Sequence, residues 1–111
     1  MAGAITRGDL VTIAVSGDYG KPRPALVVQS GLFGEHPSVT VLPLTSDLRD
    51  APMLRITVAA NGGNGLRVPS QVMVDKAVTV PRGKLAPPIG RLDSATLALV
   101  DFALARFLGV G

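Results

Sequence analysis

The chain consists of short apolar runs separated by polar breaks that contain glycine or proline, and helical spacing appears only near its end. Short runs rich in β-branched residues are typical of strands. The expected strands cover Leu10–Val15, Ala25–Gln29, Val39–Leu44, Leu54–Val58 and a long, bent Ser70–Val80. The breaks are too short to hold the crossover helix that parallel strands need, so the pattern excludes a parallel α/β layout.

The breaks add detail to this pattern. Asn61–Gly65 has the strongest turn composition in the chain and predicts a hairpin between two strands. Pro43 falls inside an expected strand and requires an edge position or a bulge, because proline has no backbone N–H to donate. Ser30–Ser38, which contains His36, predicts a loop, and Pro81–Pro88 predicts a basic, proline-rich linker.

The last apolar stretch predicts a helix over roughly Ala95–Leu108, capped by Asp93 or Ser94 and ended by Gly109. One stripe carries Leu97, Val100, Leu104 and Phe107, whereas Leu99, Phe102 and Leu108 fall mostly outside it. The helix is therefore apolar over much of its circumference. It either lies deep in the core or partly meets another subunit.

Several short strands and one terminal helix predict a mainly β fold, a small β-barrel or curled sheet with a C-terminal helix. The length of 111 residues suits one domain with one core, over 1–111. The chain has no cysteine, which excludes disulfides and thiolate-bound metals. It also lacks a signal-peptide core and a run of membrane-spanning length, so we expect a cytoplasmic protein without a membrane partner.

The composition and motifs exclude most familiar kinds of catalytic and metal-binding site. The sequence contains no cysteine nucleophile, no G-x-S-x-G motif, no P-loop and no cluster of metal ligands, so we expect neither metal nor cofactor. The single histidine, His36, is either a general base or a solvated surface residue. The net charge of +3 is compatible with a nucleic-acid ligand.

One stretch, Lys21–Gln29, places a cation in a stiff backbone. Arg23 stands between Pro22 and Pro24, which favour extended geometry at the start of a strand. A guanidinium held in this way binds a phosphate through two parallel hydrogen bonds at little entropic cost. The alternative is an ordinary loop with a solvated arginine.

Blocks along nearly the whole chain resemble the MazF/PemK family, the toxin components of bacterial toxin–antitoxin modules. In order, the matching blocks are Arg7–Val11, Arg23–Val28, Val41–Ser46, Asn64–Ser70, Val72–Lys76, Thr79–Val80 and Gly90–Leu92. The resemblance implies an SH3-like, CcdB/PemK-type β-barrel with a C-terminal helix, working as a homodimer.

Members of this family are sequence-specific, metal-independent endoribonucleases, or mRNA interferases, which cut single-stranded RNA and stop translation. A cognate antitoxin wraps the toxin dimer and blocks its RNA site. The toxin–antitoxin complex commonly binds operator DNA and represses its own operon. The resemblance therefore implies RNA, an antitoxin and a second copy of the chain as partners, with operator DNA bound only by the complex.

The family's catalytic arginine falls on Arg23 and its catalytic threonine on Thr45. The expected substrate-binding residues are Tyr19, as a stacking platform for a base, with Lys21, Ser46, Asp75 and Lys76. Where other members have a further arginine, this chain has Met73. A second cation then comes from Lys21, Lys76 or Arg82, or is dispensed with.

Each of these residues also has an ordinary interpretation. Thr45–Ser46 at a strand end is typical of a turn in which hydroxyls satisfy backbone groups. Asp75 serves equally as a structural hydrogen-bond acceptor, and Lys21, Lys76, Arg82 and Lys84 as a solvated face. Two further function classes stay open, a CcdB-like gyrase poison and an SH3-like binding module, although the scarcity of aromatic residues speaks against a proline-peptide groove.

Overall fold

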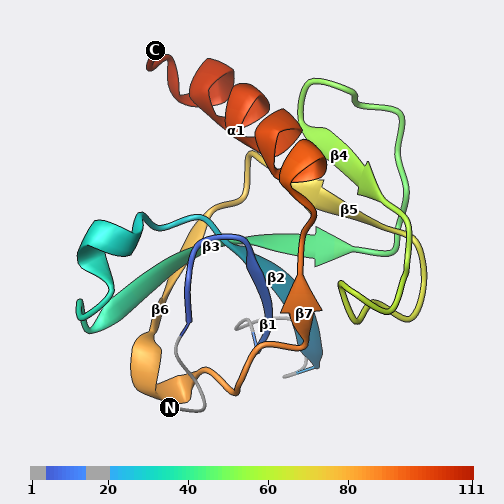
Figure 1. The fold of residues 1–111 in the computed structure, drawn as a ribbon. Coiled ribbons are helices and arrows are strands. Elements are labelled where there is room, and N and C mark those ends of the chain that lie inside the picture. Colours follow the sequence, from blue (N-terminus) through green and yellow to red (C-terminus); the bar gives the residue numbers. More distant parts are fainter. Residues whose placement is uncertain (1–4, 15–20) are drawn as a thin grey trace.

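The chain forms a strongly curled antiparallel sheet with one helix laid across it (Figure 1). The structure is a computed structural model and describes residues 5–14 and 21–111. Its strands are β1 Asp9–Ala14, β2 Pro22–Val27, β3 Ser38–Thr45, β4 Arg55–Val58, β5 Ser70–Met73, β6 Val78–Pro81 and β7 Gly90–Arg91. The helix α1 covers Ser94–Leu108, and two 3₁₀ turns, η1 and η2, cover Gly31–Phe33 and Arg82–Lys84.

The strands follow the order β4-β5-β3-β2-β1-β7, and β6 pairs with β3 as well. All of these pairs are antiparallel. The expectation of a mainly β, curled sheet is therefore confirmed. β3 is its central strand, since β2 lies along one side of it while β6 and then β5 lie along the other.

This central position corrects one expectation and excludes one of the two alternatives for Pro43. Ser70–Val80 is not one bent strand but two, β5 and β6, separated by a turn in which the Lys76 N–H donates to Met73 O at 3.2 Å. Pro43 is not on an edge strand either. It falls between the last pair with β6, at Val41, and the first pair with β5, at Leu44. The missing N–H of proline thus coincides with the point where β3 changes partner.

β2 begins three residues earlier than the apolar pattern predicts. Pro22, Arg23 and Pro24 are already strand residues, opposite Ala14, Ile13 and Thr12 of β1 respectively. Prolines and the residues before them favour extended backbone, so the proline-flanked segment extends the strand. Val15, the expected end of the first strand, lies outside the described residues.

Successive side chains of the central strands point to opposite faces of the sheet, and both faces carry buried apolar residues. One face carries the larger core: Leu10, Leu26, Leu42, Leu44, Val58, Leu66, Val72, Leu92 and Val100. The other carries Val11, Ile13, Ala25, Val27, Val39 and Val41. Because α1 contributes Val100 to the first set, it covers that face of the sheet (Figure 1).

The helix begins and ends as its sequence predicts. Asp93 is the N-cap, and its Oδ2 accepts a hydrogen bond from the Thr96 N–H at 2.9 Å. Gly109 ends the helix in the left-handed conformation, with φ 73°. The helix lies on the surface rather than deep in the core, because Leu99 and Phe102 are 59% and 64% exposed. Phe107 is also exposed, so the expected buried stripe ends at Leu104.

The two ends of the described chain are tied together. β7, which the sequence analysis missed, pairs Gly90–Arg91 with the start of β1. Asp9 is only 4% exposed, and its carboxylate accepts hydrogen bonds from the Thr6 N–H and the Arg91 guanidinium. Arg7 forms a two-point ion pair with Asp101 on α1. These contacts hold α1 over the sheet. They also position β1, the strand that ends beside the candidate site.

Among the described residues, no helix has the length and apolar character needed to cross a membrane.

Candidate nucleic-acid interface

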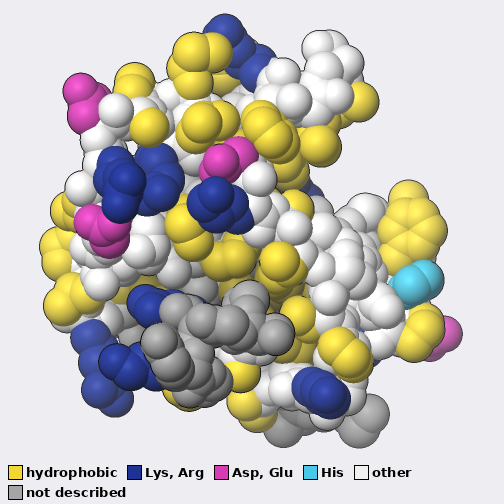
Figure 2. All heavy atoms as spheres, turned by 180° about the vertical axis from the view of Figure 1, so that it is seen from behind, with side chains coloured by type: hydrophobic (Ala, Val, Ile, Leu, Met, Phe, Trp, Pro, Cys, Tyr) yellow, Lys and Arg dark blue, Asp and Glu magenta, His cyan; other side chains and the backbone are white. Residues whose placement is uncertain are grey.

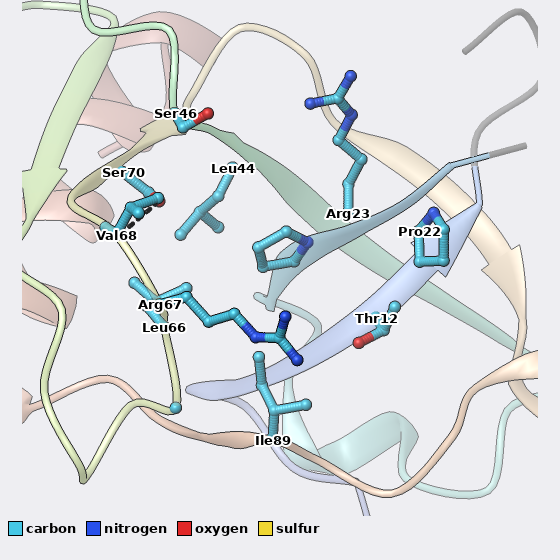
Figure 3. A pocket seen from close by; sticks show the side chains of 12 residues that line it. Thr12, Pro22, Arg23, Leu44, Ser46, Leu66, Arg67, Val68, Ser70 and Ile89 are labelled. Atoms are coloured by element: carbon cyan, nitrogen blue, oxygen red, sulfur yellow. Dashed lines mark hydrogen bonds between the residues drawn. The ribbon is translucent and has the colours of Figure 1, made fainter. Parts of the chain in front are cut away.

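A groove of about 560 Å³ opens between β2, the end of β3 and the connection from β4 to β5 (Figure 3). Its floor is apolar, and its polar groups are hydroxyls and guanidinium groups. It is lined by Thr12, Pro22, Arg23, Pro24, Leu44, Ser46, Gly65, Leu66, Arg67, Val68, Ser70 and Ile89. Within the described part of the chain, this lining carries two positive charges and no carboxylate. The groove therefore suits an anionic ligand with apolar or aromatic parts.

Arg23, the expected catalytic arginine, lines this groove. Strand pairing of Pro22, Arg23 and Pro24 with β1 fixes the backbone from which its side chain projects. Figure 3 shows the guanidinium of Arg23 on the side of the groove where Ser46 lies. The two prolines and the pairing with β1 therefore fix the backbone from which the guanidinium extends.

Thr45 and Ser46 end β3 and turn the chain away from the sheet. The Thr45 hydroxyl accepts a hydrogen bond from the Asp47 N–H at 3.1 Å, which is the turn geometry of the ordinary interpretation. A hydroxyl that accepts one bond keeps its own proton to donate. Ser46 lines the groove, whereas Thr45 is not among the lining residues. Of the two residues expected to be catalytic, Arg23 lines the groove and Thr45 does not, although the next residue, Ser46, does.

The other expected substrate-binding residues are not gathered in the groove. Tyr19 lies outside the described residues. Lys21 is exposed directly before β2, beside the groove residue Pro22. Asp75 and Lys76 form the turn between β5 and β6 and pair with each other at 3.7 Å, away from the groove lining.

Asp75 is nevertheless unusual. Its Oδ1 is buried and has no hydrogen-bond partner among the described residues. No described donor bonds this oxygen, so it does not support the interpretation of Asp75 as a structural hydrogen-bond acceptor.

His36 and Arg82 have structural contacts in the loop before β3. His36 Nδ1 accepts a hydrogen bond from the Ser38 N–H at 3.1 Å. Arg82 donates to the carbonyl oxygens of His36 and Phe33 at 2.7 and 3.1 Å. Neither residue lines the groove, so Arg82 holds a loop in place rather than offering a cation there.

Two residues of the site region were missed by the sequence analysis. Arg67 lines the groove from the β4–β5 connection and extends toward Thr12 and Ile89 (Figure 3). Gln71 is 6% exposed on β5, and its amide bonds both the N–H and the carbonyl of Arg49, at 2.9 and 3.0 Å. It therefore anchors the loop that follows Ser46. Arg67 lies inside a block of the family resemblance, but nothing in the sequence shows that this block folds back over β2.

On the face opposite to that of Figure 1, lysine and arginine side chains lie in several places, more of them toward one side, with hydrophobic and carboxylate side chains between them (Figure 2). The described residues contain no group of three or more histidine, cysteine, aspartate or glutamate side chains that could hold a metal ion. The polar chemistry that the groove itself offers comes from guanidinium and hydroxyl groups.

The curled sheet, the terminal helix and the arginine-flanked groove define a small, mainly β protein with a site for an anionic ligand. Residues 6–108 match the sequence profile of the family described as "PemK-like, MazF-like toxin of type II toxin-antitoxin system". The chain belongs to this family, and the resemblance drawn from its sequence blocks is confirmed.

Individual relatives agree with this assignment. The chain is 45% identical, over 94% of its length and 96% of the relative's, to the "Probable endoribonuclease MazF" of Mycolicibacterium smegmatis. Its fold matches the Mycobacterium tuberculosis toxin MazF-mt6 with a TM-score of 0.78 and 26% identity, over 93% and 98% of the two chains. A structure described as "Endoribonuclease in complex with its cognate antitoxin from Mycobacterial species" gives the same TM-score and identity over 97% and 98%. These relatives do not favour the CcdB-like alternative.

Proposed function

We infer that this chain is an endoribonuclease, the toxin of a type II toxin–antitoxin system, with RNA as its substrate and a cognate antitoxin as its partner. The observation that carries this inference is the 45% identity to a MazF endoribonuclease over almost the full length of both chains. The groove supports it, since an apolar floor flanked by two arginines accepts bases and phosphates together.

In this proposal the substrate is single-stranded mRNA, cut at a specific sequence without a metal ion. The working form is a homodimer in the cytoplasm, and operator DNA is bound only by the toxin–antitoxin complex. The exposed apolar face of α1, with Leu99 and Phe102, fits a second copy of the chain, because such a surface is costly to leave in water. The antitoxin acts by covering the groove, and an acidic segment complements its two cations.

The reaction begins with attack of a ribose 2′-oxygen on the adjacent phosphorus. The bond from phosphorus to the 5′-oxygen breaks, which gives a 2′,3′-cyclic phosphate and a free 5′-hydroxyl. The 2′-hydroxyl loses its proton and the leaving oxygen gains one. Negative charge gathers on the non-bridging oxygens in the transition state, where a fixed guanidinium and a hydroxyl donor stabilise it most.

Arg23 supplies that guanidinium and Thr45 that hydroxyl. Arg23 is suited to the role because its backbone is paired with β1 at Ile13 and lies between two prolines, so little backbone reorganisation is needed when charge develops. Thr45 accepts from the Asp47 N–H and keeps its proton for a phosphate oxygen. Ser46, Lys21, Asp75, Lys76 and Tyr19 contact the rest of the strand in this proposal.

The test is cleavage of an unstructured RNA in the presence of EDTA. We expect the wild-type chain to cut and the Arg23→Ala variant to lose about 10²–10³-fold in rate, the usual effect of removing one transition-state donor. Thr45→Val should lose activity while Thr45→Ser, which keeps the hydroxyl, retains most of it. Lys84→Gln, which removes one positive charge from an exposed position on η2 outside the groove, is the matched control.

Full activity of the Arg23→Ala variant would refute the assignment of the catalytic arginine. RNA left intact by the wild-type chain would refute the function itself. Sequencing the products of a mixed transcript pool would identify the cleavage motif in the same experiment.

A further inference from the structure

We propose that Arg67, rather than a residue at the position of Met73, supplies the second cation of this site by binding a second phosphate of the RNA strand. The inference rests on the proposed ribonuclease function and adds to it a substrate-binding residue on the wall of the groove away from Arg23. Met73 itself is half-buried in β5 opposite Arg55, and it is not among the groove residues.

The groove has two cations on two different elements. Arg23 projects from β2, and Arg67 projects from the connection between β4 and β5 (Figure 3). Figure 3 shows the Arg67 side chain extended toward Thr12 and Ile89, on the far side of the groove from the Arg23 guanidinium. A strand of RNA lying along the apolar floor between them therefore meets one cation on each side.

Most other cations of the described chain are engaged elsewhere. Arg7 and Arg91 pair with aspartates, Arg49 with Asp47, and Lys76 with Asp75. Arg55 donates to the carbonyl of Asp47, Arg82 to two loop carbonyls, and Arg106 lies over the ring of Phe102. Arg67, by contrast, is exposed and makes no hydrogen bond or ion pair with any described residue. Its guanidinium keeps all of its donors for a ligand.

The backbone that carries Arg67 is fixed although the side chain is exposed. Asn61 and Asn64 bond each other's N–H groups through their side-chain oxygens at 2.9 and 3.1 Å. Asn64 also accepts from the N–H of Leu66, the buried residue just before Arg67, at 3.0 Å.

The turn is also pressed against the segment that leads into β7. The Arg91 N–H donates to the carbonyl of Gly63 at 2.9 Å. At Gly65 and Gly90 the two backbones approach so closely that a Cβ on either would lie within 3.0 Å of the other segment. Because the backbone of this corner is already ordered, binding at Arg67 costs side-chain entropy but not the ordering of a loop.

Arginine in this setting suits a phosphate better than a base. The planar guanidinium forms two parallel hydrogen bonds to phosphate oxygens, and the apolar floor at Leu44, Leu66 and Ile89 strengthens them by excluding water. Among the described residues, no carboxylate lines the groove to compete for the charge.

The test measures binding without cleavage. The probe is a random-sequence RNA pool of about 20 nucleotides, more than the ~4–16 that one small β-barrel covers. It carries 2′-O-methyl groups throughout, so it lacks the attacking hydroxyl. We expect Arg67→Gln to weaken binding about tenfold at low salt and to lower the slope of log K against log salt by about 0.7, the contribution of one single-strand phosphate. Arg67→Lys should restore the slope, since it keeps the charge.

Lys84→Gln, at an exposed position outside the groove, is the control for loss of one positive charge and should leave the slope unchanged. Because Arg67 is exposed and makes no hydrogen bond or ion pair with any described residue, its glutamine variant should unfold at the wild-type urea midpoint, which separates a binding defect from a folding defect. If the wild-type chain cuts RNA while Arg67→Gln binds the probe with unchanged affinity and slope, the inference is refuted and the proposed function stands. If the wild-type chain neither cuts RNA nor binds the probe, both are refuted.

Discussion

Replacing Gly65 and Gly90, where the Asn61–Gly65 turn meets the chain at Ile89–Gly90, and Gly62, which lies in the same turn but outside the contact, tests how that contact is built. Gly65 has φ +72°, and a Cβ there would lie closer than 3.0 Å to the carbonyl group of Ile89. Gly90 has no positive φ, yet its Cβ would lie closer than 3.0 Å to the backbone of Asn64 and Gly63. Gly62 is in the same turn, but a Cβ there meets open space and its φ is not positive.

These geometries give different costs for a change to alanine. The left-handed conformation costs a non-glycine residue about 1–2 kcal/mol, and forced overpacking adds about 1–3 kcal/mol. We expect Gly65→Ala to lower the free energy of unfolding by about 2–5 kcal/mol. Gly90→Ala carries only the packing cost, about 1–3 kcal/mol. Gly62→Ala should be neutral, or stabilising by about 0.4–1 kcal/mol through the unfolded chain.

Urea unfolding at one protein concentration checks this order. Stability changes appear as shifts of the midpoint with an unchanged slope, provided that the transition is two-state. Since Gly62 and Gly65 lie in one turn and receive the same methyl group, composition and general loop effects cancel. A Gly65→Ala midpoint equal to that of Gly62→Ala would refute the close packing of the turn against Ile89.

Three further changes test the core, the loop after β3 and the helix cap. Leu42→Ala, in the fully buried core, should cost about 3–5 kcal/mol in unfolding experiments, while Leu99→Ala on the exposed helix face should cost much less. Gln71→Ala leaves two backbone groups of the loop after Ser46 without partners and should cost about 1–3 kcal/mol, with a rise in KM for RNA. Hydrogen bonds from the Thr96 side chain and then its backbone lower the pKa of Asp93 below its ordinary value of 3.8. Stability from this cap is therefore complete above pH 3.8 and lost as pH falls through the lower folded pKa, a loss that Asp93→Asn should not show.

Much of the fold could be predicted because its signals are local. The cap at Asp93 and the end of α1 at Gly109 depend on residues within one turn of them, and both are confirmed. β7 could not be predicted, since a two-residue strand exists only through its pairing with β1. The division of Ser70–Val80 also depends on a distant partner, because β3 offers separate lengths to β5 and β6.

The same distinction applies to the site. Arg23 could be proposed from its two flanking prolines, which fix the backbone locally. Arg67 could not, because its place in the groove depends on the contact between a turn near Gly65 and a segment near Gly90. Thr45, Asp75 and Lys76 remain predictions, since their roles depend on how a substrate lies.

The ties between the two ends of the chain have a consequence for protein synthesis. Arg91 and Asp101 are added to the growing chain 82 and 94 residues after their partners Asp9 and Arg7. Before then the Asp9 carboxylate has no cation to accompany it into the core, and burying it alone is strongly unfavourable. The turn that carries Arg67 also lacks the segment against which it packs. A partly translated chain on the ribosome therefore has no finished groove, and toxicity begins only after the C-terminal elements emerge.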